Sequence, residues 1–219
     1  MKITHHPQPE SLMSCSAGSM PEAFAAIMSS HMALCPECRK DLALMEDIGV
    51  ALFDKIDATP VLGDVPVMAL RASEADRGDT DDGQTRAAVT TGGVPRPLVD
   101  VIGGDLEAIT WKHIGPGVWQ HVIPLSDAPR GELRLIKVAP GRALPEHGHT
   151  GSELTLVLKG AYRDETGHYR PGDVADISGD ISHQPIADPA EGCVCLIATE
   201  GRLKFKSIMA RIMQPFAGI

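Results

Sequence analysis

The stretch from residue 141 to residue 160, "GRALPEHGHTGSELTLVLKG", carries the most restrictive residue pattern in the chain. His147 and His149 are two positions apart, so on a β-strand both side chains point to the same face. Glu153 has the same parity and begins an apolar run. Two imidazoles and a carboxylate on one face are ligands that a divalent transition ion accepts. The stretch therefore predicts a β-domain that holds a metal on one wall.

Short segments rich in Val, Ile, Leu and Thr flank this stretch, and Gly-Pro turns separate them. Many short strands at regular spacing are typical of an all-β sandwich or barrel. We expect strands within 118–125, 131–139, 153–165, 173–177 and 193–208. The sequence thus predicts an all-β domain over residues 105–219.

A fourth ligand is expected from another strand, and His183 in "ISGDISHQP" is placed for it. A lone H-x-H pair is more often a surface or core feature than a metal site. Here, however, G-x5-H-x-H-x3-E-x6-G is matched at every fixed position, which resembles the first motif of the cupin superfamily. That resemblance implies a double-sheet jelly-roll barrel with an internal ion, zinc or alternatively manganese or iron. In the second cupin motif Gly172, Gly179 and His183 match, but Ala187 stands where Asn is frequent.

The first 56 residues have helical rather than strand periodicity. Ser19 and Glu22 have the spacing of a capping box, and the apolar stripe that follows predicts a helix ending near Cys35. A second helix is expected to begin at Pro36, and a short earlier helix over 10–17 is expected to stop at Gly18.

The junction of those two helices reads "HMALCPECRK", residues 31–40. His31 and Cys35 are one helical turn apart, and Cys38 follows three residues later, so the three side chains can converge at the bend. Two thiolates and an imidazole are three ligands of a zinc site, and His5 or His6 could supply a fourth. A redox Cys pair would need a βαβ context, which is missing. Cysteines serving only as small apolar residues leave the placement of Pro36 unexplained.

Between the two halves the chain is rich in Pro, Gly and Asp, with one amphipathic helix expected over 64–77. We expect a helical domain over 1–85, a linker over 86–104 and the β-domain over 105–219. The net charge of −9 disfavours direct nucleic-acid binding, and no apolar run approaches the roughly 20 residues of a membrane span. The N-terminus lacks a signal-peptide core, so a cytoplasmic location is expected.

H-x3-C-x2-C across two helices resembles the zinc-binding anti-sigma domain of bacterial regulators, and its fusion to a cupin resembles the ChrR family of anti-sigma factors. The resemblance implies α+β modules, with a zinc-stapled helical bundle before a cupin barrel. It implies that the helices sequester an extracytoplasmic-function (ECF) sigma factor, and that the cupin releases it upon oxidative stress (singlet oxygen or organic hydroperoxide). It favours His6 over His5 as the zinc ligand. The implied ligands are His6, His31, Cys35, Cys38, His147, His149, Glu153 and His183.

Two other functions fit parts of the sequence. A metal-dependent cupin enzyme, such as a dioxygenase or isomerase, would use the same barrel ligands with open positions on the ion. A zinc-stapled binding module for another protein would differ only in its partner. No further acid–base set is expected, because His168 and the acidic residues around it are expected to face solvent. Cys193 and Cys195 alternate on a strand and are expected to pack rather than to sense.

Overall fold

A computed structural model describes residues 2–57, 94–126, 130–178, 181–200 and 203–205. The helix expected over 64–77 lies outside these residues. The helices are α1 (Pro9–Ser16), α2 (Glu22–Leu34), α3 (Pro36–Phe53) and α4 (Arg96–Ile102), followed by the 3-10 turn Leu106–Ala108. The strands are β1 (Lys112–Gly115), β2 (Val118–Ile123), β3 (Glu132–Val138), β4 (His147–His149), β5 (Glu153–Gly160), β6 (Tyr162–Arg163), β7 (His168–Tyr169), β8 (Val174–Ile177), β9 (Ile186–Ala187), β10 (Cys193–Thr199) and β11 (Leu203–Phe205).

The N-terminal helices begin and end close to where the sequence predicts. α1 stops before Gly18, whose φ of 63° is the left-handed conformation that glycine adopts without strain. Pro36 occupies the first turn of α3, where its missing N–H has no partner to lose. The predicted capping box is wrong. Pro21 is the N-cap of α2, and the Ser19 hydroxyl instead donates to the carbonyl of Ser14 at 3.2 Å.

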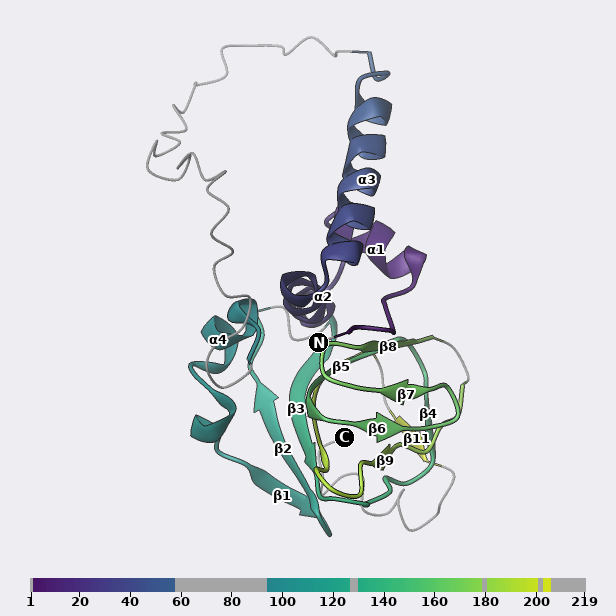
Figure 1. The fold of residues 1–219 in the computed structure, drawn as a ribbon. Helices are drawn as coiled ribbons and strands as arrows, with labels where there is room; N and C mark the ends of the chain where they lie inside the picture. The colour runs from purple at the N-terminus through teal and green to yellow at the C-terminus, as the bar shows by residue number, and fades with distance from the viewer. Residues whose placement is uncertain (1, 58–93, 127–129, 179–180, 201–202, 206–219) are drawn as a thin grey trace.

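The β-domain contains an antiparallel six-stranded sheet with the order β1-β2-β3-β10-β5-β8. Two smaller sheets, β11-β4 and β7-β6-β9, complete it (Figure 1). An isolated bridge pairs His147 with His183, which brings β4 beside the segment before β9. The prediction of helices followed by an all-β domain is confirmed.

The two faces of the six-stranded sheet contribute to different cores, because side chains alternate along each strand. On β3, Leu133 and Leu135 join a cluster that includes Ile27 and Met28 of α2, all of them completely buried. On the other face, Ile136 joins a cluster that is contained within the β-domain. The helical module therefore shares one continuous core with the sheet.

The other helices surround α2 at this end of the molecule. α4 packs against α2 and buries Val94 and Leu98, although this region was expected to be a linker. α1 packs on the first turns of α3, and the rest of α3 stands away from the body (Figure 1). None of the helices in the described part of the chain combines the length and apolar composition needed to cross a membrane.

Candidate metal-binding groups

Four side chains from three separate segments converge at the bend between α2 and α3, and we call them the Cys/His group. It consists of His6, His31, Cys35 and Cys38, whose candidate ligand atoms all lie within 4.8 Å of one another. The Cys38 Sγ is 3.2 Å from His6 Nδ1 and 3.3 Å from His31 Nε2. Cys35 is the N-cap of α3, and its Sγ accepts from the Cys38 N–H at 3.4 Å. Local helix geometry and an extended N-terminus together build this group.

The protonation of the Cys/His group suits a cation. Burial lowers the pKa of His31 to about 4, so this imidazole is neutral at pH 7. Its Nδ1 donates to the Gly172 carbonyl at 2.9 Å, which leaves the Nε2 lone pair on the side of Cys38. Burial and the neighbouring Cys35 raise the pKa of Cys38 to about 12. A positive ion would favour the thiolate form of such a sulfur, so ion binding would release a proton.

Three imidazoles form a second cluster, the histidine group, inside the β-domain. It consists of His147, His149 and His183, all buried, with candidate ligand atoms within 4.8 Å of one another. The Nε2 atoms of His149 and His183 are 3.2 Å apart. His147 Nδ1 donates to the Pro145 carbonyl at 2.8 Å, so its Nε2 carries the lone pair. Three nitrogen donors that converge in this way fit a borderline transition ion such as zinc.

Burial favours the neutral, ligating form of two members of the histidine group, although the Asp164 carboxylate raises the pKa of the third, His183. Burial lowers the pKa of His147 and of His149 to about 4 in each case. Burial also raises the pKa of Glu153, a carboxyl that is fully enclosed and accepts from the Thr155 hydroxyl at 3.0 Å. The Glu153 Oε2 lies 3.3 Å from the Nε2 of His149, so this predicted ligand borders the group.

Sequence reasoning missed Asp164, which was expected to face solvent. Its carboxylate is fully buried, and Oδ2 lies 2.8 Å from His183 Nδ1. Burial would raise the pKa of Asp164, but the hydrogen bond from His183 holds it below its usual value. Because Asp164 accepts the Nδ1 proton of His183, the Nε2 of His183 faces the histidine group. Carboxylates commonly orient metal-binding histidines in this way. The i to i+2 turn motif "DET", with Thr166 bonded to Asp164, was the available signal.

His5 and His6 take different positions despite being adjacent. The Nδ1 of His6 enters the Cys/His group, as the family resemblance favoured. His5 instead packs its ring on Tyr169, with centroids 4.5 Å apart. His168 is exposed, as expected.

Cys193 and Cys195 lie side by side in the core of the β-domain, with their sulfurs 3.1 Å apart. The hydrogen bond with Cys193 and burial raise the pKa of Cys195 well above its usual value. A buried neutral thiol is a poor nucleophile, so the geometry is that of packing.

The chain is similar to known proteins over nearly its whole length. A family model described as the ChrR cupin-like domain matches residues 100–202. The anti-sigma-E factor ChrR of Cereibacter sphaeroides is 35% identical over 218 residues, which cover 99% of each chain. A chain in the crystal structure of Rhodobacter sphaeroides SigE in complex with the anti-sigma ChrR is 31% identical, with a TM-score of 0.71. That match covers 91% of this chain and 100% of the other.

The relative resembles this chain over both halves, so the likeness is not confined to the cupin fold that enzymes also use. The sequence prediction of a regulator rather than a cupin enzyme is thereby confirmed. The chain belongs to the ChrR family of anti-sigma factors.

Proposed function

We propose that this chain sequesters an ECF sigma factor in the cytoplasm through its helical domain, residues 1–85, and releases it when the cupin domain, residues 105–219, responds to oxidative stress. The observation that carries the proposal is the likeness over the whole chain to a ChrR that is described in complex with SigE. The segment 86–104, which includes α4, would connect the two domains.

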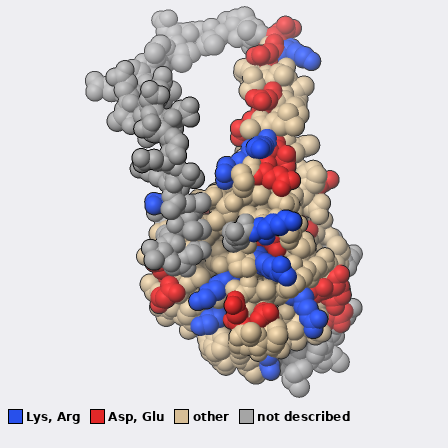
Figure 2. Space-filling view, viewed as in Figure 1, with Lys and Arg blue, Asp and Glu red and all other residues tan. Residues whose placement is uncertain are grey.

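The exposed part of α3 is the surface best suited to hold the sigma factor. Leu44, Ile48 and Leu52 follow one another at steps of four along α3 and are 54–60% exposed, and Ile56, which is 69% exposed, continues the spacing beyond the helix end at Phe53. Residues at that spacing form a single stripe along a helix, as in helices that bind in the groove of a partner. Acidic side chains lie beside the uncharged surface of this protruding helix (Figure 2). A basic, groove-bearing partner such as a DNA-binding protein would complement both features.

Zinc is the ion that the Cys/His group fits best, because thiolate and imidazole are its preferred ligands. When bound, zinc would cross-link the N-terminus, α2 and α3 and so contribute directly to the folding free energy of the helices. Cys35 and Cys38 would hold the ion from the start of α3, His31 from α2 and His6 from the N-terminal segment. The histidine group with Glu153 would hold a second ion, again zinc or alternatively manganese or iron.

Capture of individually expressed ECF sigma factors from the same organism by the immobilised chain tests sequestration. Ile48→Lys should weaken capture of the matching factor by about 10-fold to 100-fold, because a buried interface charge without a partner is costly. The free chain should keep its stability, since Ile48 is 54% exposed. Lys40→Ala, a change of an exposed charge near the base of the same helix, is the control. Undiminished capture by the Ile48→Lys variant would contradict docking on α3.

The release step is tested in cells that carry a reporter for the captured sigma factor. His147→Ala should leave the reporter repressed and abolish its induction by singlet oxygen or by an organic hydroperoxide. Constitutive reporter expression in this variant would mean that the cupin contributes to holding the sigma factor rather than to the response.

A further inference from the structure

The N-terminal segment, residues 4–8, covers the β8 edge of the six-stranded sheet. β8 is the last strand in the sheet order, so its outer backbone groups have no neighbouring strand within the sheet. Val174 donates its N–H to the carbonyl of His5 at 3.1 Å, and Gln8 donates its N–H to Asp176 Oδ2 at 2.8 Å. The segment thus behaves as an edge cover attached by a few hydrogen bonds.

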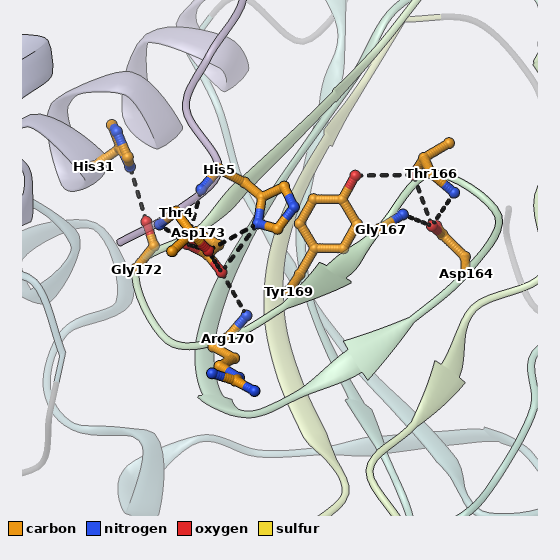
Figure 3. Close-up of polar contacts among 10 residues, drawn as sticks. All are labelled: Thr4, His5, His31, Asp164, Thr166, Gly167, Tyr169, Arg170, Gly172 and Asp173. Carbon is orange, nitrogen blue, oxygen red and sulfur yellow. Dashed lines mark hydrogen bonds and ion pairs between the residues drawn. The ribbon is translucent and has the colours of Figure 1, made fainter. Parts of the chain in front are cut away.

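Asp173 anchors this cover. Its fully buried carboxylate accepts from the backbone N–H groups of Thr4 at 2.7 Å, His5 at 3.1 Å and Arg170 at 2.9 Å (Figure 3). The His5 ring adds a further contact, with Nδ1 3.3 Å from Oδ2. Hydrogen bonds to a buried charge are among the stronger ones in proteins, so most of the attachment is concentrated on one side chain.

A chain of contacts leads from the cover to the histidine group. The His5 ring lies on Tyr169, whose hydroxyl is 2.8 Å from the Thr166 hydroxyl. Thr166 donates to Asp164 Oδ1 at 2.6 Å, which leaves Tyr169 as the donor to Thr166 (Figure 3). The other oxygen of Asp164 accepts from His183. Every link is a direct contact between side chains, and the last residue belongs to the histidine group.

The other end of the cover leads to the Cys/His group. His6 follows His5 directly, so its position in the group depends on where residues 4 and 5 are held. His31 reaches the same part of the cupin independently, because its Nδ1 donates to the carbonyl of Gly172, the neighbour of Asp173. Contacts therefore connect both candidate metal groups to the cover, and His31 of the Cys/His group also contacts the turn that precedes β8.

We propose that the segment of residues 4–8 is a releasable edge cover, anchored by Asp173, through which the histidine group controls how firmly His6 is held in the Cys/His group. The two states are the cover docked on β8 and the cover detached from it. A perturbation of the histidine group shifts this equilibrium through Asp164, Thr166 and Tyr169. Coupling of this kind acts in both directions, so disruption of the Cys/His group also loosens the cupin end. Binding of a sigma factor is not required.

Hydrogen exchange in the full-length chain measures detachment of the cover directly. Asp173→Asn should accelerate exchange at the amides of Thr4 and His5 by about 10-fold to 100-fold, because the lost bonds are charge-assisted. The matched control is Asp188→Asn, in which the carboxylate accepts from the N–H groups of Ala190 and Glu191 within one cupin turn. In the control variant, the amides of Thr4 and His5 should exchange at the same rate as in the unaltered chain. Equal exchange in both variants would overturn the role of Asp173.

A double-mutant cycle tests the coupling. His149→Ala alters the histidine group at a residue outside the contact chain and should accelerate exchange at Thr4 and His5 by about threefold or more. Tyr169→Phe removes only the hydroxyl link to Thr166, and in that background His149→Ala should have little additional effect. The proposal is overturned if His149→Ala leaves the exchange rates of Thr4 and His5 unchanged. It is also overturned if His149→Ala changes these rates equally in the unaltered and the Tyr169→Phe backgrounds.

Exchange in β3 and β10 shows whether the cupin core stays folded in these variants. If His149→Ala unfolds the core, Asp164→Asn replaces it, because that change removes the charged acceptor of His183 Nδ1 and retains all three histidines. The expected acceleration at Thr4 and His5 is the same. A second variant, Gly167→Ala, would place a Cβ 3.0 Å from His5 Nε2 and 3.2 Å from the Tyr169 ring. The added methyl group should also accelerate exchange at the amides of Thr4 and His5. Unchanged exchange in this variant would contradict a role for the His5–Tyr169 contact.

Discussion

The two candidate metal groups are built on opposite principles. The Cys/His group collects single residues from an extended segment, the end of α2 and the start of α3, so it depends on how three separate segments are held relative to one another. The histidine group sits on strands and bridges of a hydrogen-bonded β-domain, and a buried carboxylate fixes one of its histidines. An ion would therefore act as a structural staple in the first group, whereas the second is formed largely in advance. The difference fits the proposed division of roles, in which the first site supports folding and the second the response.

Removal of a thiol from the Cys/His group is expected to have the largest effect. Cys38→Ser should abolish zinc retention at this group and capture of the sigma factor, because structural zinc contributes on the order of 10 kcal/mol to small folded modules. Zinc content per chain, circular dichroism and the capture assay measure the outcome. Cys15→Ser is the control, since Cys15 is a half-buried thiol on α1 outside the group. Intact capture by a zinc-free Cys38→Ser variant would remove the structural role of this site.

The shared core beneath α2 predicts a smaller effect on both halves. Ile27 is completely buried between the helices and the sheet. Ile27→Ala should therefore reduce the free energy of unfolding by about 2–4 kcal/mol, from lost burial and from the cavity that remains. Chemical denaturation should show helices and sheet losing stability together. Leu44→Ala, a truncation of a side chain that is 60% exposed, should change stability by no more than about 0.5 kcal/mol. Separate transitions for the two halves would contradict a common core.

Sequence patterns predicted most of the elements and both groups, since period, turn residues and ligand spacing are local properties. The H-x-H pair lies on β4. The helix end predicted at Gly18 and the helix start predicted at Pro36 are both found in the structure. Contacts between distant segments were the part that local patterns could not reveal. The cap of α2 at Pro21 depends on the path of the preceding chain, and burial of Asp164 depends on the folding of its turn onto His183.

The apolar stripe of α3 is a second feature whose surroundings local sequence patterns could not predict. The helix predicted to begin at Pro36 is present as α3. In an isolated chain such a stripe would be expected to pack inward, yet Ile48 and Leu52 are exposed in the structure. Periodicity identifies an apolar face, but it does not tell whether the chain itself or a partner covers it.

The smallest of these effects concerns the carboxylate behind the histidine group. Asp164→Asn retains the shape of the side chain, but an amide no longer offers a charged acceptor to His183 Nδ1. Loss of such a partner commonly weakens metal binding by about 10-fold to 100-fold, so the cupin ion should be released more readily to a competing chelator. Zinc in the Cys/His group should be affected less than the cupin ion, because Asp164 reaches His6 only indirectly, through Thr166, Tyr169 and the segment of residues 4–8. Asp188→Asn, which alters a carboxylate in a remote turn, should leave both ions in place. Competition assays that resolve the two ions decide the outcome, and equal weakening of both would mean that the two groups do not differ in how their ligands are supported.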